Sequence, residues 1–212
     1  MAPDGTMGGG EVLLCDGAGS RSIARLEPVP LPGGDRCAQE GWRMAAAYGL
    51  DAPPPGVDSR VFHLVRMLAA SGRVPRTSAA GGLLDAVASL LGLCQVSSYE
   101  GEAAGLLDAA ADPEVTAAID LELHQNRHLF AELTARHRRG DGAPVLAALL
   151  HNSLAAAIVR TCARAGARKV LLAGSCFRDR QLLERCASGL LGAGMEPLAN
   201  ARPHPIPVVA GL

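Results

Sequence analysis

Two short apolar runs near the start of the chain flank a glycine-rich turn. Residues 11–15 (EVLLC) and 22–26 (SIARL) are the runs, and the glycines of residues 16–20 adopt positive φ without steric cost. Proline and glycine make residues 27–34 irregular, and a helical pattern follows over residues 39–48. The pattern predicts a β-hairpin, an irregular connection and a helix.

The pattern changes after a triple proline at residues 53–55 and Gly56. From Val61 to Gly166 the apolar spacing is mostly helical, so we divide the chain into a hairpin and irregular leading segment, residues 1–52, and one domain, residues 53–212. The first three predicted helices carry apolar stripes: Val61, Leu64, Val65 and Leu68 in the first, Leu83, Leu84, Val87, Leu90 and Leu91 in the second, and Leu106 and Leu107 in the third. One or two more helices are predicted within residues 115–137. A long helix then extends to Arg164, with Pro144 in its first turn and Gly166 at its end.

A strand–helix–strand unit is predicted near the end of the chain. Residues 169–174 (KVLLAG) form a short buried strand, and a second strand is expected near residues 195–198. The helix between them has inward positions at Leu182, Leu183, Cys186 and Leu190. In an α/β protein such a unit places a ligand outside the carboxyl end of its strand.

Composition excludes several classes of function. Of the 212 residues 49% are hydrophobic, and 20 basic residues face 21 acidic ones, which leaves no positive excess for a nucleic-acid backbone or an anionic membrane. The first residues lack the features of a secretory leader. The uncharged residues 142–159 keep their large apolar side chains on one stripe, which is typical of a core helix. We expect a cytoplasmic protein that binds neither nucleic acid nor membrane.

The cysteines and histidines suggest structural roles. The six cysteines show neither a C-x-x-C pair nor a Cys/His ligand spacing, so we expect reduced core thiols. His124 and His128 have a spacing that can bind a metal, but their polar neighbours, Asn126 among them, favour a solvated face. His151 lies on the apolar long helix and is expected to be a satisfied core histidine.

The first candidate for ligand binding is the strand-to-helix turn at residues 173–180. Its glycine lets the backbone approach an anion, and the N-terminus of the next helix offers free N–H groups. The alternative interpretation is structural: glycine and serine only shape the turn, and Asp179 caps the helix. For Cys176 in this turn we favour a buried thiol over a thiolate, because the sequence places no histidine beside it.

Two further helix starts carry glycine with a carboxylate nearby. Residues 77–82 are followed by Asp85, and residues 98–101 contain Glu100. Both patterns are compatible with ribose and phosphate contacts and equally with ordinary capping.

Taken in order, these segments resemble the C-terminal part of the Kae1-like carbamoyltransferase domain of HypF, a family of hydrogenase maturation proteins. The resemblance covers nearly the whole chain, and its motifs are colinear. They are Pro3-Asp-Gly-Thr6 with Gly9-Gly-Glu11, Leu31-Pro-Gly-Gly-Asp35, Trp42-Arg-Met-Ala45, Ala80-Gly81 with Leu84-Asp-Ala-Val-Ala88 and Leu90-Leu-Gly-Leu93, Tyr99-Glu-Gly101 with Ala103-Ala104, residues 151–156 and residues 174–185.

The resemblance implies an α/β fold of the actin-like, sugar-kinase and Hsp70 class, here its helix-rich C-terminal lobe with an N-terminal β-hairpin. It implies carbamoyl transfer from carbamoyl-adenylate, made from carbamoyl phosphate and ATP, to the C-terminal cysteine of HypE, for cyanide ligand synthesis in [NiFe]-hydrogenases. It also implies contacts to the ribose and adenine of ATP or AMP from Gly81, Asp85, Glu100 and Gly101, and close backbone approach at Gly174. Together with the neighbouring Ser175, these are the six candidate nucleotide-binding residues.

The sequence also departs from the family. Ser175 stands where the family has a glycine, and its Cβ obstructs the close approach of a phosphate to the backbone. Gly82 stands where the family usually has an arginine, a planar cation suited to phosphate oxygens. The family's metal-binding aspartate is missing from residues 202–211, and we expect the first lobe with its phosphate loop and H-x-x-x-H motif to be missing too. The iron or zinc of the family is therefore predicted absent.

These departures predict a truncated, degenerate lobe that folds but does not catalyse alone. Its expected partners are a HypE-like protein or a complementing N-terminal half of HypF, and an apolar sheet face left uncovered would also allow a homodimer. Two alternatives stay open. One is a non-catalytic binding or scaffold module, and the other is an O-carbamoyltransferase for small molecules.

Overall fold

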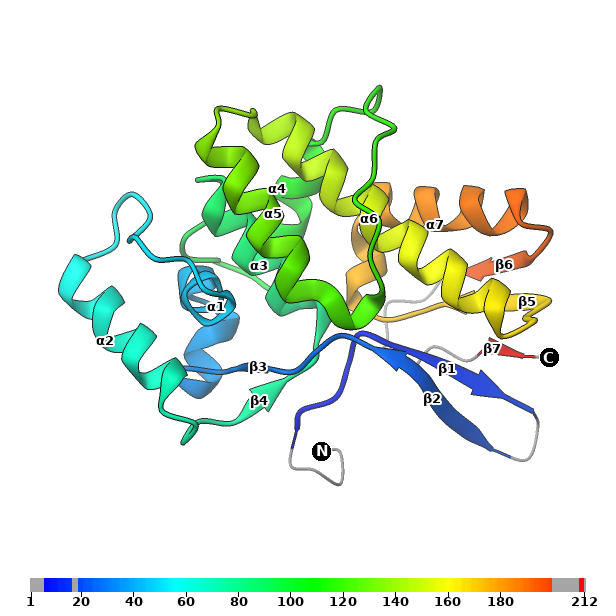
Figure 1. The fold of residues 1–212 in the computed structure, drawn as a ribbon, viewed down its shortest axis with the longest axis horizontal. Helices are drawn as coiled ribbons and strands as arrows, with labels where there is room; N and C mark the ends of the chain where they lie inside the picture. Colours follow the sequence, from blue (N-terminus) through cyan, green and yellow to red (C-terminus); the bar gives the residue numbers. More distant parts are fainter. Residues whose placement is uncertain (1–5, 17–18, 200–209, 212) are drawn as a thin grey trace.

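The computed structural model describes residues 6–16, 19–199 and 210–211. Figure 1 shows helices packed against a sheet that carries the amino-terminal hairpin. The strands are β1 (Glu11–Cys15), β2 (Ser20–Arg25), β3 (Val29–Pro30), β4 (Arg76–Thr77), β5 (Lys169–Leu172), β6 (Glu196–Ala199) and β7 (Ala210–Gly211). The helices are α1 (Gly41–Tyr48), α2 (Ser59–Ala70), α3 (Ala80–Leu90), α4 (Glu102–Ala110), α5 (Asn126–Arg138), α6 (Ala143–Arg164) and α7 (Arg180–Gly192), with 3-10 helices η1 (Gly34–Ala38), η2 (Leu123–Gln125) and η3 (Ser175–Arg178).

The main sheet has five strands in the order β2-β1-β7-β5-β6. β1 and β2 form the predicted antiparallel hairpin, and β5 and β6 are the predicted parallel pair, joined through α7. β7 runs parallel to β1 and antiparallel to β5, so β1 and β5 point in opposite directions. β3 lies in a stretch that we expected to be irregular, and it pairs with β4 in a second, two-stranded sheet.

The hydrophobic core is centred on α6, which has the predicted Pro144 near its start and Gly166 after its end. Its length and composition would suit a membrane span, but 67% of its most apolar window is buried inside the protein. This burial supports the core-helix interpretation of residues 142–159. The core also includes side chains of α1, such as Tyr48, whose ring centroid lies 5.3 Å from that of Phe130 in α5. The division of the chain at residue 52 stays a prediction.

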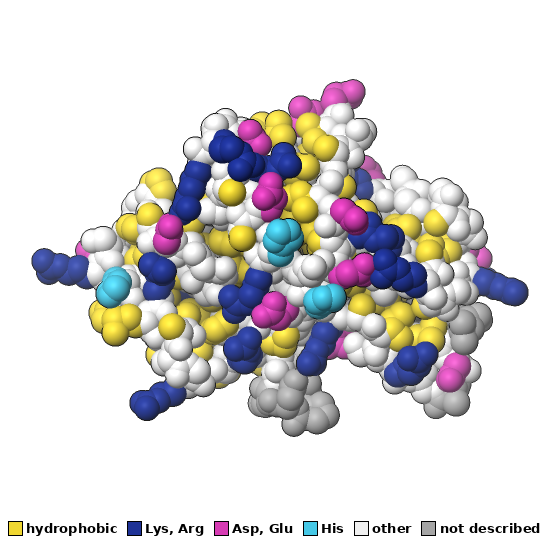
Figure 2. Space-filling view, viewed as in Figure 1, with side chains coloured by type: hydrophobic (Ala, Val, Ile, Leu, Met, Phe, Trp, Pro, Cys, Tyr) yellow, Lys and Arg dark blue, Asp and Glu magenta, His cyan; other side chains and the backbone are white. Residues whose placement is uncertain are grey.

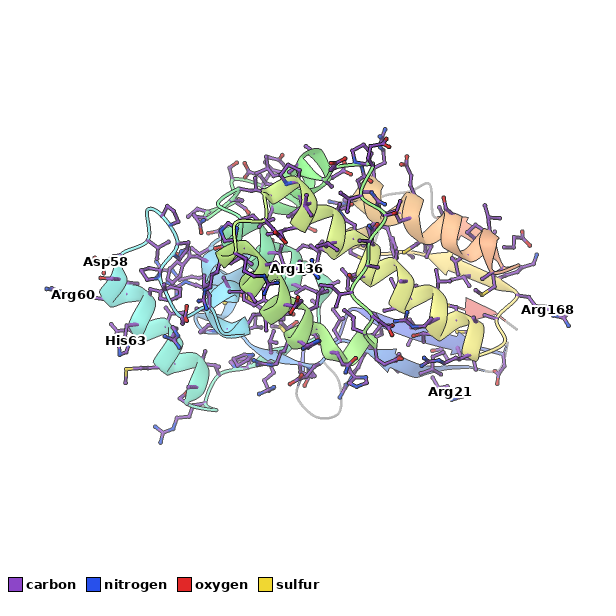
Figure 3. All side chains as sticks on the ribbon, turned by 45° about the horizontal axis from the view of Figure 1, so that its top comes forward. Arg21, Asp58, Arg60, His63, Arg136 and Arg168 are labelled. Carbon is purple, nitrogen blue, oxygen red and sulfur yellow. The ribbon has the colours of Figure 1, made fainter. Side chains whose placement is uncertain are left out.

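Helix α2 forms as predicted, but its orientation differs from the expected one. Of the apolar stripe, Val65 is buried, whereas the side chain of Leu64 is 63% exposed. Phe62 is the buried anchor instead, with its ring centroid 6.2 Å from that of Trp42 in α1. Figure 3 shows Asp58, Arg60 and His63 on the outer side of this helix.

Among the described residues, α2 carries more of the exposed large apolar side chains than any other helix or strand, whereas the sheet, where we expected such surface, carries fewer. Leu198 is the large exposed apolar residue in the described strands. Figure 2 shows apolar side chains at the α2 end of the molecule and at other places on the same face, with basic and acidic side chains interspersed among them. The apolar residues exposed on α2 are Val61, Leu64, Met67 and Leu68.

The region predicted to hold one or two helices within residues 115–137 contains less helix than expected. Residues 115–122 are non-helical, and α5 begins at Asn126. Polar side chains of α6 bind the backbone of this segment: Asn152 Nδ2 donates to the carbonyls of Val115 and Ala117 at 2.8 and 2.7 Å. These bonds take the place of helical hydrogen bonds, so tertiary contacts override the local pattern.

Candidate functional site

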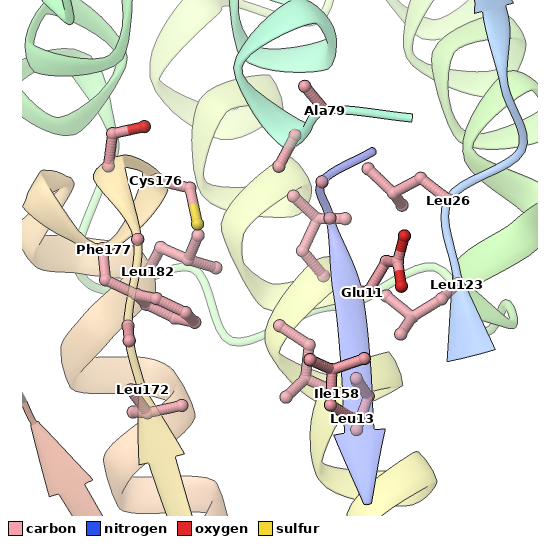
Figure 4. Close-up of a pocket in the computed structure, with 18 of the residues that line it drawn as sticks. Glu11, Leu13, Leu26, Ala79, Leu123, Ile158, Leu172, Cys176, Phe177 and Leu182 are labelled. Carbon is pink, nitrogen blue, oxygen red and sulfur yellow. The ribbon is translucent and has the colours of Figure 1, made fainter. Parts of the chain in front are cut away.

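A cavity of about 550 Å³ lies between β1 and β5 (Figure 4). Because these strands run in opposite directions, the start of β1 and the end of β5 lie at the same end of the sheet. Three glycine-bearing turns meet there: residues 8–10 before β1, residues 79–81 at the start of α3, and residues 174–176 after β5. The cavity thus lies outside the carboxyl end of β5, where the strand–helix–strand pattern predicted a ligand.

The rest of the cavity has mostly apolar walls. Figure 4 shows Leu13 of β1 and Leu172 of β5 on opposite sides of the gap, with Ile158 of α6 behind them. Glu11 adds a carboxylate at the β1 side. A glycine-lined end with an apolar body matches the general composition of small-molecule sites.

The N-terminus of α3 opens onto this cavity. Among the described residues no side chain caps it, and its first turn carries no acidic residue. The Ala79 amide donates to Thr77 Oγ1 at 3.0 Å, whereas Ala80 and Gly81 line the cavity. No atom lies within 4 Å of the position that a Cβ on Gly81 would occupy. The positive end of the helix dipole and its first N–H groups are therefore accessible to an anion.

The N-terminus of α7 is closed to an anion, which corrects the expectation of free N–H groups there. Asp179 Oδ1 accepts from the Leu182 amide at 2.9 Å, so the capping prediction is confirmed. Asp108 Oδ1 of α4 accepts from the Gln181 amide at 2.8 Å. Two carboxylates already satisfy these donors, and η3 separates them from Gly174.

A buried pair holds this turn against α6. His151 Nε2 lies 2.7 Å from Asp179 Oδ2, and both side chains are fully buried. His151 is therefore the core histidine that the sequence predicts, satisfied at Nε2, while its Nδ1 has no partner in the described part of the chain. The pair fixes the segment that carries Gly174 and Ser175 to the central helix.

The cysteines are free thiols, as predicted. Burial raises the pKa of Cys176, beside Gly174, to about 11, which favours the thiol over the thiolate at neutral pH. Burial likewise raises the pKa values of Cys37 and Cys162 to about 11. None of these three groups is a ready nucleophile.

Three of the six predicted nucleotide-contacting residues, Gly81, Gly174 and Ser175, line the cavity. Gly174 has φ 105°, a conformation that favours glycine, and Ser175 is exposed. Sequence reasoning missed the turn at residues 8–10, although the glycine run directly before a predicted strand was a usable signal. It also missed the apolar walls.

The other three predicted residues lie outside the cavity lining. Asp85 is one turn further along α3, next to Gly41 of α1, and burial raises the pKa of its carboxyl to about 7. Glu100 and Gly101 are exposed before α4. There Glu102 accepts from the Ser98 hydroxyl at 2.8 Å, a bond that closes the turn before the helix, while no side chain of the described residues caps α4 at Gly101.

The histidine pair does not form a metal site. His124 lies on η2 and His128 on α5, and both are exposed, as the solvated-face interpretation expects. Asn126 between them is instead fully buried and bonds to Glu27 and Tyr48, so that part of the interpretation is wrong. Over residues 6–16, 19–199 and 210–211, no three His, Cys, Asp or Glu side chains could hold a metal. The described residues therefore do not fit the iron or zinc of the family.

Comparison with known proteins defines the class first. A family model described as the second subdomain of the Kae1-like domain of carbamoyltransferases, HypF_C_2, matches residues 1–206. The fold is similar to that of full-length HypF solved in a phosphate- and nucleotide-bound form, with a TM-score of 0.83 and 24% identity over 94% of this chain and 29% of that one. T. kodakarensis HypF gives a TM-score of 0.76 at 20% identity, over 92% of this chain and 29% of that one. The structure thus has the expected fold, a helix-rich α/β lobe of the Kae1-like class.

Sequence relatives identify the family. Carbamoyltransferase HypF of Rhodobacter capsulatus is 39% identical over 210 residues, which cover 92% of this chain and 28% of the relative. Carbamoyltransferase HypF of Rhizobium leguminosarum bv. viciae is 35% identical over 208 residues, covering 92% and 27%. The chain therefore belongs to the HypF carbamoyltransferase family. It spans less than a third of the length of these two relatives.

Proposed function

We propose that this chain forms the nucleotide-binding side of a HypF-type carbamoyl-transfer site and works together with the remaining parts of a HypF. The observation that carries the proposal is the uncapped N-terminus of α3, which shares a cavity with the Gly174 turn. Both features allow backbone N–H groups to approach a phosphate. The nucleotide-bound form of a structural relative supports the same assignment.

The proposed substrate is carbamoyl-adenylate, and the proposed acceptor is the C-terminal cysteine of HypE. The acceptor cysteine gives its proton to solvent and attacks the carbamoyl carbon as a thiolate, the bond from that carbon to the phosphate oxygen breaks, and AMP leaves with the electron pair on its phosphate. The α3 N-terminus stabilises the negative charge on the phosphate. Ribose and adenine contacts from Asp85, Glu100 and Gly101 remain part of the proposal, as does a cytoplasmic location. No step is assigned to a metal.

A nucleotide titration tests this proposal. AMP is titrated by calorimetry into the purified chain, alone and mixed with Rhodobacter capsulatus HypF that lacks the matched segment. We expect saturable binding in the mixture. Gly81→Glu places a carboxylate at the α3 N-terminus, which favours the helix but repels phosphate, and should weaken AMP binding at least about tenfold.

The matched control is Gly105→Glu in α4, an exposed glycine that likewise has no atom within 4 Å of the position its Cβ would occupy. It should leave AMP affinity unchanged. Absence of binding in the mixture, or equal weakening by both variants, would contradict the proposed nucleotide site.

The exposed apolar face of α2 favours a second candidate function, that of a non-catalytic binding module for a maturation protein such as HypE. Under this alternative, HypE binds the chain although neither the chain nor the mixture binds AMP. Leu64→Lys on α2 would then weaken HypE binding, because Leu64 is 63% exposed there.

A further inference from the structure

The outer face of α2 and a groove beside it form one exposed apolar surface. Val61, Leu64 and Leu68 lie at helical i, i+3 and i+7 spacing, and Met67 lies next to them. The side chains of these four residues are between 40% and 63% exposed. Apolar side chains that gather on one exposed helix face, rather than lying singly, indicate an interaction site.

The groove gives this surface a concave side. Its volume is about 380 Å³, and Val61 lines it together with Trp42 of α1 and residues 55–58. Val96, which is 62% exposed, lines it from the segment between α3 and α4. A protein segment that docks on α2 would therefore also place a side chain in this groove.

The charges around this surface are basic. Residues 59–84 contain four arginines and no aspartate or glutamate. Arg60, in the first turn of α2, and Arg73, just after its end, are exposed and form no ion pair in the described part of the chain. Arg60 lies four residues before Leu64, so the two side chains share a face of the helix. Asp58, which precedes the helix, caps it by accepting from two backbone amides at 2.9 and 3.0 Å.

These charges decide between the possible occupants of the surface. A second copy of this chain would bring the same arginines together, and like charges across an interface oppose association. An anionic membrane would match the charge, but a flat bilayer surface does not fill a recessed groove. A protein helix with an apolar stripe and acidic flanks covers the apolar face, fills the groove and neutralises the arginines.

We propose that α2 and the groove beside it dock an acidic amphipathic helix of a partner protein. The apolar stripe of that helix packs on Leu64 and Leu68, and one of its side chains enters the groove beside Val61. Its carboxylates lie next to Arg60 and Arg73. The inference goes beyond the proposed nucleotide site and does not depend on it, because it concerns a different surface of the molecule.

Two designed peptides test the proposed docking surface. Both are helical, about 18 residues long and free of tryptophan, with leucines at i, i+3, i+4 and i+7 spacing; one has glutamates beside this stripe and the other has lysines. Trp42 is the single tryptophan of the chain and lines the groove, so its fluorescence reports binding. We expect the glutamate peptide to bind at least about tenfold more tightly than the lysine peptide, and less tightly as the salt concentration rises.

Matched substitutions of exposed residues locate the binding surface. Leu64→Asn should weaken binding of the glutamate peptide at least about tenfold, whereas Leu191→Asn in α7 should leave it unchanged, although both leucines are 63% exposed. Arg60→Glu should weaken the glutamate peptide and strengthen the lysine peptide. Arg168→Glu makes the same change of charge at an exposed arginine at the opposite end of the molecule (Figure 3) and should do neither.

The results also separate the other occupants. The inference is wrong if neither peptide changes Trp42 fluorescence, if both bind equally well, or if Leu64→Asn and Leu191→Asn weaken binding equally. It is also wrong if Leu64→Asn converts a dimer to a monomer in analytical ultracentrifugation, or if the chain binds phosphatidylserine vesicles through Leu64 but not the glutamate peptide. Leu64-dependent binding of the glutamate peptide by a chain for which no mixture restores AMP binding would support this inference and overturn the proposed nucleotide site.

Discussion

Arg43 shows how residues of a family motif serve the fold. Its guanidinium donates to the Pro32 carbonyl at 3.2 Å and to Glu40 at 2.6 Å, and it lies 4.6 Å from the centroid of the Trp42 ring. A Cβ on Gly33 would come within 3.0 Å of this guanidinium, and Gly33 has φ 115°. The L-P-G-G-D and W-R-M-A motifs therefore form one structural unit, apart from the ligand site.

Asp85 makes stability depend on pH. Burial raises its pKa from 3.8 to about 7, so between these pH values the folded state holds a proton that the unfolded state releases. Stability is therefore lost as pH rises through this window. Asp85→Asn should raise the free energy of unfolding by about 2 kcal/mol at about pH 8 and change it little at about pH 4. Urea unfolding at both pH values measures this.

The control is Asp35→Asn, which alters an exposed aspartate on η1. Its effect should be small and the same at both pH values. An Asp85→Asn effect that does not vary with pH would show that the carboxyl is not the source of the dependence.

His151 is buried and His124 is exposed, so their substitution by alanine should change the free energy of unfolding by different amounts. His151→Ala removes the partner of the buried Asp179 carboxylate and should lower the free energy of unfolding by about 3 kcal/mol. His124→Ala changes an exposed side chain and should stay within about 0.5 kcal/mol of the wild type. Equal effects in urea unfolding would contradict the role given to the buried pair.

Asn126 shows why the burial of a single residue could not be predicted from its neighbours in the sequence. Its neighbours Gln125 and Arg127 are polar, which favoured a solvated position. In the structure its side chain accepts from the Glu27 amide at 2.7 Å and donates to the Tyr48 hydroxyl at 3.0 Å. These partners are 99 and 78 positions away in the sequence. Polarity of near neighbours carries no information about such contacts.

At the scale of elements, helices were predictable where their ends carry clear signals. α6 begins with Pro144 at its second position and is followed by Gly166 with φ 68°. The orientation of α2 was not predictable, because its apolar residues occupy more than one face and Phe62 competes with Leu64 for the core. β3, β4 and β7 have two residues each, which is too short to show the alternation of apolar and polar residues that predicts a strand.

The non-helical segment at residues 115–122 should depend on Asn152. Asn152→Ala removes the amide that donates to the Val115 and Ala117 carbonyls, and Val115 keeps, among the described residues, only a longer bond of 3.4 Å from Arg185, so we expect a loss of about 2 kcal/mol in the free energy of unfolding. Cleavage after Glu122, the last residue of the segment, by a glutamate-specific protease should also become faster. Gln39→Ala, at an exposed amide side chain, is the control, and a similar loss there would contradict this assignment.

At the scale of the whole molecule, the fold class followed from the family resemblance, and half of the predicted site residues share one cavity. Gly81 and Gly174 are far apart in sequence but meet at one end of the sheet. The closure of the α7 N-terminus could not be predicted, because Asp108 reaches it from α4. The apolar walls of the cavity were not predicted either, because they depend on the order of strands in the sheet.

The central claim is that this lobe supplies the nucleotide side of a carbamoyl-transfer site to the remaining parts of a HypF. The most direct measurement follows labelled carbamoyl from carbamoyl phosphate, with ATP, onto the C-terminal cysteine of HypE. The account predicts labelling only when the chain and the Rhodobacter capsulatus remainder are both present, with a rate at least about tenfold lower for Gly81→Glu than for Gly105→Glu. Equal labelling by the remainder alone, or none from a mixture that binds AMP, would contradict it.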